Sequence, residues 1–377
     1  MALFGSSASN LIGLDIGSST IKVVSLQSVR GGYQLEAAGV EPLPGGSVVD
    51  GAIAKREAVA DAINHVFHSR KIKGDSIASS VSGPAVIVKR ISLPARSAAE
   101  VGESIHWEAE QCIPFDIAEV YLDYHLLGPS EDGSETNVIL VAVKRETIDN
   151  QSDVIAMAGK EPAIMDLDSF ALHNIYEVNY RPKPDSVVAL LNIGASIMNV
   201  NIATGNEFIF TRDIGMGGNY YTEYIQRDLG VSYEEAEKYK KGQAPEELKG
   251  TVSTVLQSVS EILSLEVQKT FDYFRTASEF EELETIYICG GASRTEGLRD
   301  YLQETFQVPV ECLNPFQKIK ADGNALPAGN DGCDFAVAAG LALRYRGDKP
   351  TGPASKGNAF GFLTGNMPQI FKKLTKR

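Results

Sequence analysis

Two segments of the chain repeat one pattern of apolar and polar positions. Residues 11–24 read LIGLDIGSSTIKVV and residues 188–202 read VALLNIGASIMNVNI. In each, an apolar strand ends at an acidic or amide residue, a glycine turn follows, and a second strand rich in β-branched residues begins. Because internal repeats determine the architecture, we predict two related halves, each opening on a β-hairpin. Two such turns facing each other are suited to holding a polyphosphate between them.

The remainder of the first half alternates strands and helices. The predicted elements are strands over 11–16, 20–26 and 33–40, a helix over 56–67, strands over 77–81 and 85–91, a helix over 98–112, strands over 120–127 and 138–143, a helix over 146–158, a strand over 163–167 and a helix over 168–178. The Ser82-Gly83-Pro84 turn predicts that the strands on either side of it form a hairpin. The order of elements over about 76–160 predicts a small α+β module inserted into the first half.

The second half repeats the three-strand opening and then becomes helical. Its predicted elements are a strand over 207–212, a helix from Gly217-Gly218, a helix over 232–241, a long helix over 252–277, a strand over 285–289, a helix up to 306 and a helix over 335–344. The helix over 232–241 carries a start signature and is predicted to be capped and solvent-facing. Small residues in the middle of 335–344 predict that this last helix packs closely against a neighbour.

These patterns predict an α/β protein of two lobes. At 377 residues the chain is too long for one ordinary core. Two prolines in 181–185 predict the linker between the lobes. The predicted divisions are 1–75 with 161–183 for the first lobe, 76–160 for the inserted module, 184–346 for the second lobe and 347–377 for a flexible tail rich in Gly, Pro and Ser.

Composition narrows the possible functions. The net charge of −14 argues against binding of nucleic acid, which requires clustered Lys and Arg. No apolar run approaches the length needed to cross a bilayer, and the first residues carry no secretory signal. The four cysteines lack the paired spacing of a zinc site or a disulfide framework. The octamer 370–377 is basic with three apolar residues, which fits either an amphipathic surface-seeking tail or a solvated end.

The first glycine turn combines several groups that bind phosphate. Gly17 lets the backbone approach a ligand closely, and the hydroxyl groups of Ser18 and Ser19 add donors. Asp15, at the end of the strand, is suited to hold Mg²⁺ through water, because this ion keeps much of its hydration shell. Lys22 is predicted either to reach a phosphate or to lie on the surface. The alternative for the whole segment is an ordinary hairpin turn.

Two further glycine turns favour the phosphate interpretation. The second turn carries Asn192, Gly194, Ala195 and Ser196. The third, Gly290-Gly291-Ala292-Ser293-Arg294, follows a strand and opens a helix, which lets the backbone approach a flat purine ring and its ribose. Three glycine turns in this order, at these separations, are hard to assign to chance.

These three segments resemble the phosphate-1, phosphate-2 and adenosine motifs of the actin-like ATPase superfamily. Within it, the inserted module resembles the one that replaces the usual subdomain of actin in FtsA and in the PilM family of type IV pilus assembly proteins. The segments WEAEQCIPF (107–115) and YLDY (121–124) closely resemble the signature of the PilM family. The resemblance covers about residues 10–344 and implies an actin-like, ribonuclease H-like fold of two domains with an inserted α+β subdomain.

The resemblance implies ATP with Mg²⁺ in the cleft between the lobes. The implied contacts are Asp15, Gly17, Ser18, Ser19 and Lys22 on one side, Asn192, Gly194, Ala195 and Ser196 on the other, and Gly290, Gly291, Ala292 and Arg294 beside the adenosine. It further implies that Glu266 and Lys269 face the ribose and base from the long helix. The alternative for this last pair is a solvated i,i+3 ion pair.

The resemblance also implies a partner. Proteins of this family bind the cytoplasmic amino-terminal segment of the inner-membrane protein PilN, which places them in the cytoplasm at the inner membrane, with other components of the pilus platform. We carry that contact over to Trp107, Ile113, Pro114 and Phe115, the alternative being that Trp107 and Phe115 form the core of the inserted module. Peripheral contact with the membrane and self-association stay open.

One position departs from the superfamily. The second turn usually begins with Asp, and here it begins with Asn192. An amide brings no charge to offset Mg²⁺ and is no general base, whereas phosphoryl transfer depends on charge stabilisation around the metal and the γ-phosphate. We therefore expect weak or absent hydrolysis, with the nucleotide acting as a conformational ligand.

Three rival functions share the fold. The first is an FtsA-like filament protein of cell division with the basic octamer as its membrane anchor. The second is a small-molecule kinase, for which the only candidate carboxylates are Asp123 and Asp166, neither within a motif. The third is the cytoplasmic part of a GspL-type secretion protein, a class that continues into a membrane span.

Overall fold

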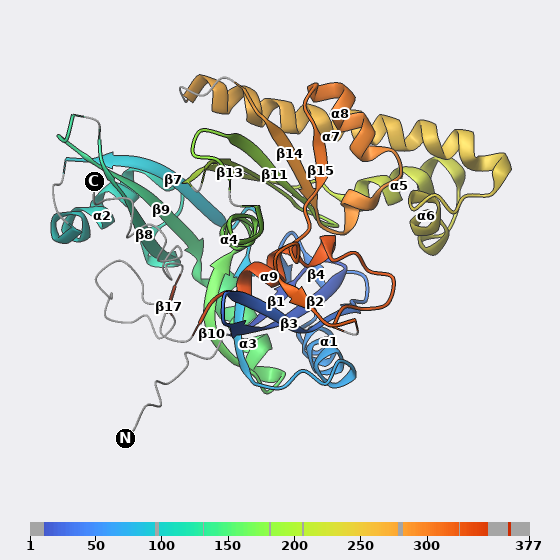
Figure 1. The fold of residues 1–377 in the computed structure, drawn as a ribbon, viewed down its shortest axis with the longest axis horizontal. Coiled ribbons are helices and arrows are strands. Elements are labelled where there is room, and N and C mark those ends of the chain that lie inside the picture. The colour runs from blue at the N-terminus through green and yellow to red at the C-terminus, as the bar shows by residue number, and fades with distance from the viewer. Residues whose placement is uncertain are drawn as a thin grey trace.

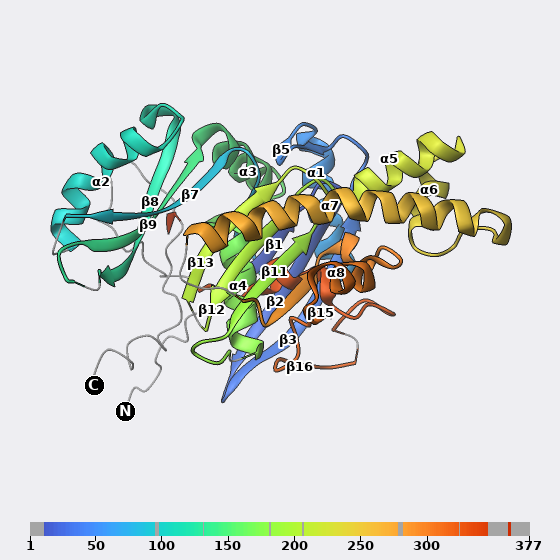
Figure 2. The ribbon, with the colours of Figure 1, turned by 90° about the horizontal axis from the view of Figure 1, so that it is seen from above.

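The computed structural model describes residues 11–94, 98–130, 132–180, 182–205, 207–277, 282–323, 325–345 and 361–362. Two mixed sheets form two lobes, and the helices α4 (Asp168–Tyr180) and α9 (Ala336–Leu341) lie between them (Figure 1). A third, smaller sheet forms a module to one side (Figure 2). The fold is therefore of the predicted actin-like class, with two related lobes and an inserted module.

The first lobe is built on a seven-stranded sheet. Its order is β16-β3-β2-β1-β6-β10-β17. The strands are β1 (Ile12–Ile16), β2 (Thr20–Val29), β3 (Gly32–Pro42), β6 (Ser76–Val81), β10 (Glu161–Leu167), β16 (Lys320–Ala321) and β17 (Gly361–Phe362). Alternation along β2 sends Ile21 and Val23 into the core under helix α1 (Arg56–Ser69), and Val24 and Leu26 into the core between the lobes. A two-stranded ribbon, β4 (Val48–Val49) with β5 (Ala52–Ile53), precedes α1.

The second lobe repeats the meander and adds two parallel strands. Its order is β13-β12-β11-β14-β15. The strands are β11 (Val187–Ile193), β12 (Met198–Thr204), β13 (Glu207–Ile214), β14 (Thr285–Cys289) and β15 (Val310–Cys312). Its helices are α5 (Gly218–Leu229), α6 (Tyr233–Lys240), α7 (Lys249–Ala277) and α8 (Leu298–Phe306). The apolar residues at helical spacing along α7, such as Val259, Leu263 and Val267, are buried against this sheet.

The inserted module consists of a three-stranded sheet and one helix. The strands are β7 (Val86–Leu93), β8 (Val120–Pro129) and β9 (Thr136–Lys144) in the order β7-β9-β8, and the helix is α2 (Ala98–Cys112). Alternate residues of β9 face α2 and the first lobe, so that Leu140 packs in the core of the module while Val141 packs in the core of the lobe. The sheet is thereby attached to the lobe along one face.

The predicted hairpin between 77–81 and 85–91 is wrong. Strand β6 pairs in parallel with β1 and β10, within the first sheet, and the following turn at Gly83 (φ 93°) sends β7 out into the module. The small polar side chains of β6 are suited to this buried place because partners surround them. Ser79 donates to the carbonyl of Leu14 at 2.8 Å, and Gln151 of helix α3 (Arg145–Met157) donates to the Ser79 hydroxyl at 2.8 Å.

Helix α3 also packs with the first lobe, since Ile148, Val154 and Ile155 belong to its core. The division of the chain at residues 76 and 160 stays a prediction. Two elements within that range, β6 and α3, belong to the first lobe, since β6 pairs within its sheet and α3 packs in its core. The predicted tail, 347–377, lies outside the described residues except for Gly361 and Phe362, which pair with β10. No described helix combines the length and the apolar character needed to span a bilayer.

The two helices between the lobes touch at their backbones. A Cβ added at Gly340 of α9 would lie 1.9 Å from the carbonyl oxygen of Ala171 in α4, and one added at Gly13 of β1 would lie 1.9 Å from the carbonyl oxygen of Ala338. Only glycine permits these contacts, as the small-residue run predicts. A buried ion pair between Asp166 and Arg344, at 2.8 Å, joins the ends of β10 and the α9 segment.

Glu177 of helix α4 is a buried carboxylate whose ionisation opposes folding. Glu177 is 4% exposed, and its two carboxylate oxygens have no hydrogen-bond partner among the described residues. Burial raises the pKa of Glu177 from 4.5 to about 7. The folded protein therefore holds this proton more tightly than the unfolded chain does.

We predict that the free energy of unfolding falls as the pH rises from about 4.5 to about 7, by about 3 kcal/mol for this one group. Glu177→Gln removes that part of the pH dependence and is more stable than the wild type above pH 7. Urea denaturation across this range measures both effects, with the exposed Glu57→Gln on α1 as the matched control. Parallel curves for the wild type and Glu177→Gln would contradict the prediction.

Candidate functional site

The two predicted glycine turns have the same geometry. In the first lobe Ile16 pairs with Ile21, and the Gly17 N–H donates to the carbonyl of Thr20 at 3.1 Å. In the second lobe Ile193 pairs with Met198, and the Gly194 N–H donates to the carbonyl of Ile197 at 3.0 Å. The repeat in the sequence is thus a repeat of one four-residue turn, closed in each lobe by one equivalent hydrogen bond.

Both turns line a single cavity of about 500 Å³ between the lobes. The predicted nucleotide residues that line it are Asp15, Gly17, Ser18, Ser19, Lys22, Asn192, Gly194, Ala195, Ser196, Gly290, Gly291, Ala292 and Arg294. In this part of the chain the backbone N–H groups of Ser18, Ser19, Ala195 and Ser196 donate to no described acceptor. Donors that point into a cavity from two turns form a site for an anion.

The first-lobe wall of the cavity carries two carboxylates and one lysine. Lys22 donates to Asp15 at 2.9 Å, and both side chains are nearly buried. Burial lowers the pKa of Lys22, but the charge and hydrogen bond of Asp15, together with the charges of Asp334 and Asp168, outweigh it, and the net pKa lies above its ordinary value. Burial, and then the charge of Asp15, raise the pKa of Asp168 to about 7, although Ser80 donates to this carboxylate at 2.6 Å. The wall therefore holds more negative charge than one lysine offsets.

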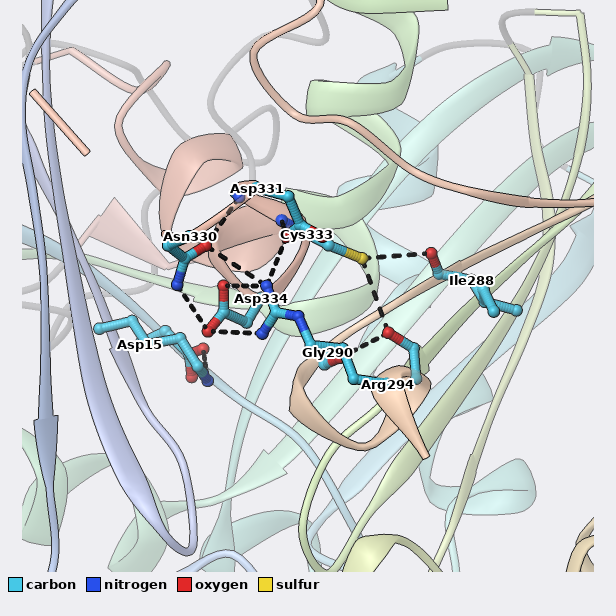
Figure 3. Close-up of polar contacts among 11 residues, drawn as sticks. Asp15, Ile288, Gly290, Arg294, Asn330, Asp331, Cys333 and Asp334 are labelled. Carbon is cyan, nitrogen blue, oxygen red and sulfur yellow. Dashed lines mark hydrogen bonds and ion pairs between the residues drawn. The ribbon is translucent and has the colours of Figure 1, made fainter. Parts of the chain in front are cut away.

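The third glycine turn lies where β14 ends beside β11. Gly290 has φ 85°, and a Cβ there would lie 2.5 Å from the carbonyl oxygen of Ile193, so the position requires glycine. A Cβ at Gly291 would meet nothing within 4 Å, so this backbone faces open space in the cavity. Arg294 leaves the turn toward Asp331 and Asp334, and Asp15 lies beyond them on β1 (Figure 3). Arg294 and Asp334 both line the cavity.

Helix α6 supplies a part of the site that the sequence prediction missed. Ser232 and Glu235 form the predicted capping box, and one face of the helix is exposed as predicted, but its other face is buried, with Lys240 7% exposed. Lys240 donates to the Thr222 hydroxyl at 2.8 Å and pairs with Glu237, and both Lys240 and Glu237 line the cavity. Burial lowers the pKa of Lys240, which Glu237 partly offsets. The signal in the sequence was this i,i+3 charge pair beside Lys241.

Glu266 and Lys269 do not line this cavity. They pair with each other on α7, and Glu266 also approaches Arg212 of β13, with 3.7 Å between its carboxylate and the guanidinium. Their placement opposite the ribose is therefore corrected, and the i,i+3 ion pair describes them. Asp123 and Asp166, the carboxylates considered for a kinase, also lie away from it: Asp166 is paired with Arg344, and Asp123 accepts from the Tyr124 N–H.

A second cavity, of about 410 Å³, adjoins the first. Ser82 and Ile197 line both. The second cavity is further lined by Val86–Lys89 of β7 and Thr211–Asp213 of β13. Each of these strands is the outermost of its sheet as described, so that two sheet edges face the same space.

The four predicted partner residues line neither cavity. Trp107 is 62% exposed on the outer face of α2, and Ile113 is buried in the core of the module. Pro114 is exposed, while Phe115 packs against the module core with the Lys144 ammonium 4.8 Å from its ring centroid. Trp107 is therefore not a core residue, whereas Ile113 and Phe115 are.

Comparison with known proteins identifies the family. A model of the family described as type IV pilus assembly protein PilM matches residues 13–346. The chain belongs to this family. Its membership favours pilus assembly over the division-filament, kinase and secretion-system alternatives.

Solved structures agree with this assignment. A chain in the PilM-PilN type IV pilus biogenesis complex is 28% identical, with a TM-score of 0.80 over 89% of this chain and 98% of that one. The ethanolamine utilization protein EutJ from Carboxydothermus hydrogenoformans is 15% identical, with a TM-score of 0.55 over 88% of this chain and 89% of that one. A diol dehydratase-reactivating factor in its nucleotide-free form is 9% identical, with a TM-score of 0.53 over 89% of this chain and 99% of that one. The last two share the fold alone.

The charge distribution of the site predicts a response to magnesium. Lys22→Met leaves Asp15 and Asp168 in one wall without their lysine, so we expect a lower melting temperature than in the wild type. Millimolar Mg²⁺ should restore part of the loss, because a divalent cation neutralises both carboxylates. Differential scanning calorimetry with and without MgCl₂ measures this, with the exposed Lys55→Met as the control. An equal response of the two variants to Mg²⁺ would count against a cation site here.

Proposed function

We propose that this pilus-assembly scaffold binds Mg-ATP between its lobes and uses the nucleotide to set their closure. The observation that carries the proposal is the pair of equivalent turns on opposite walls of one cavity, each presenting unsatisfied backbone N–H groups. A ligand held by both turns binds the closed arrangement better than the open one and shifts the population toward closure.

The donor set suits magnesium bound with a nucleotide. Asp15, Asp168 and the hydroxyl groups of the first turn supply the hard oxygen atoms that Mg²⁺ prefers. No group of three or more His, Cys, Asp or Glu in the described ranges is arranged as a metal cage, which suits an ion held by water and phosphate oxygens. When bound, the ion offsets the charge of the phosphates and of the two carboxylates. Gly291 leaves room for the base.

The second-lobe turn makes hydrolysis weak. Asn192 stands at its start, and its amide nitrogen donates to the Asn199 side chain at 2.7 Å. A neutral amide already engaged with a neighbour neither attracts the metal nor accepts a proton from water. We expect the nucleotide to serve as a ligand that is turned over slowly.

The second cavity is our candidate for the partner. The similar PilM chain occurs in a complex with PilN, and we propose that a PilN-like amino-terminal peptide adds to the outer edge of β7. Support comes from the two outer strands facing this cavity and from its apolar lining by Pro84, Val86 and Val88. A free sheet edge supplies main-chain hydrogen bonds, and flanking pockets supply specificity. Such a partner would hold the chain at the inner membrane.

Gly291→Leu tests nucleotide binding directly. The leucine meets no protein atom near its Cβ and projects into the cavity, so we expect an unchanged melting temperature and ATP affinity reduced at least about tenfold. Isothermal titration with Mg-ATP measures the loss. Gly250→Leu, at another open glycine outside the cavity, is the control. A wild type that binds no ATP at millimolar concentration would overturn the proposal.

Val88→Asp tests the partner cavity. A carboxylate in the apolar lining of β7 should abolish binding of a synthetic peptide that carries the amino terminus of the PilN-like protein, because burying the charge is unfavourable. Arg90→Asp, two residues along the same strand and outside the cavity, should bind the peptide as the wild type does. Fluorescence anisotropy of the labelled peptide measures both. Binding by Val88→Asp with wild-type affinity would place the peptide elsewhere, with the surface around Trp107 as the next candidate.

A further inference from the structure

Three polar side chains stand in one row across the second sheet. Asn192 of β11 is directly opposite Asn199 of β12, and Asn199 is directly opposite Asp213 of β13. The Asn192 amide nitrogen donates to Asn199 Oδ1 at 2.7 Å, and the Asn199 amide nitrogen donates to Asp213 Oδ1 at 2.7 Å. We call these three residues the polar row.

The polar row joins the two cavities. Asn192 and Asn199 line the nucleotide cavity, while Asp213 lines the second cavity. The other carboxylate oxygen of Asp213 accepts from the backbone N–H of Gly83 at 2.6 Å, across the boundary between the lobes. Gly83 lies in the turn that leads into β7, three residues before the strand begins at Val86. The row thus runs from the second glycine turn to the root of the edge strand in the partner cavity.

Packing reinforces this connection. Ile197 is the last residue of the second glycine turn, and its Cδ1 lies 2.8 Å from where a Cβ at Gly83 would be. The turn at Gly83 is therefore packed against the phosphate-binding turn of the other lobe as well as hydrogen-bonded to the polar row. Movement of either turn displaces the other, because close-packed contacts do not stretch.

The direction of the hydrogen bonds explains the amide at 192. An ionised Asp213 accepts hydrogen bonds only, so Asn199 must turn its nitrogen toward Asp213 and its oxygen toward β11. The residue at 192 must then donate, which asparagine does and ionised aspartate does not. Asparagine in place of the usual aspartate at position 192 is thus the residue that an ionised Asp213, two strands away, requires.

We propose that the polar row couples nucleotide binding to peptide binding, with Asn192, Asn199 and Asp213 acting as positioning residues. The inference rests on the proposed function of the two cavities. A nucleotide that hydrogen-bonds to the Asn192 amide competes with Asn199 for that amide. The resulting shift of Asn199 is passed through Asp213 to the backbone at Gly83. By linkage, the peptide alters nucleotide affinity by the same factor.

A charge exchange tests the row. In Asn192→Asp a carboxylate flanks Asn199 on each side, and its amide nitrogen can donate to only one of them, so the Asn199 oxygen faces an acceptor and one link breaks. In Asp213→Asn all three side chains are amides, and reversal of Asn199 and Asn192 keeps every link. In the double variant Asn192→Asp/Asp213→Asn, Asn199 reverses and every donor again meets an acceptor. The two substitutions should therefore be strongly non-additive.

The measurement is a ratio that does not depend on basal affinities. We titrate the labelled amino-terminal PilN-like peptide with and without Mg-AMPPNP and compare the two dissociation constants. We expect a ratio of about fivefold or more in the wild type, a ratio near one in Asn192→Asp, a retained ratio in Asp213→Asn, and recovery in the double variant. Tyr221→Phe, which removes the Tyr221–Ser260 hydrogen bond of the same lobe outside both cavities, should keep the wild-type ratio. Melting temperatures should show the same pattern, the double variant lying closer to the wild type than Asn192→Asp does.

The outcomes separate the coupling from the proposed function. A wild type that binds both ligands with a ratio of one, or an Asn192→Asp variant that keeps the wild-type ratio, would overturn the coupling and leave both cavities as proposed. A wild type that binds neither ligand would overturn the proposed function and the coupling with it. If a single variant fails to fold, recovery of folding in the double variant supports the row, and additive loss overturns it.

Discussion

The closeness of the helices between the lobes is the constraint on which the rest of the structure depends. Gly340 of α9 lies against the backbone of α4 at Ala171, and Gly13 of β1 lies against α9 at Ala338. Because no side chain separates these backbones, α4 and α9 pack closely, and the two sheets lie on opposite sides of this helix pair (Figure 1). That approach brings the two glycine turns, 177 residues apart in the sequence at Gly17 and Gly194, to facing walls of one cavity.

The two walls are equivalent in backbone and different in charge. The first-lobe wall has Asp15 and Asp168 with Lys22, whereas the second-lobe turn begins with a neutral amide. A duplicated turn keeps its N–H groups whatever its side chains are, so anion binding survives the change. Charge stabilisation of a transition state depends on the side chains and does not survive it. This difference is the reason for our proposal that the site holds a nucleotide and cleaves it slowly.

The inserted module lies next to both lobes. Its sheet shares apolar contacts with the first lobe through β9, and its edge strand β7 faces β13 of the second lobe across the smaller cavity. A ligand in that cavity touches both lobes and is sensitive to their closure. The polar row and Ile197 occupy the wall between the two cavities, which is where a change in one must pass to reach the other.

Local patterns in the sequence determined the elements and the turns. The helix over 98–112 and the strand over 285–289 have the predicted bounds, because capping and side-chain periodicity act over a few residues. The three glycine turns lie where turn chemistry predicts them, and all three line one cavity. Only the tertiary structure decided which elements pair and which faces are buried. Ser79 of strand β6 finds its partners 65 and 86 residues away, at Leu14 and Met165, and no local signal distinguishes that from a hairpin with β7. The Glu237–Lys240 and Glu266–Lys269 pairs have the same i,i+3 spacing in the sequence. Packing of α6 against α5 brings the first pair to the cavity and buries Lys240 there. The second pair lies on the outer face of α7.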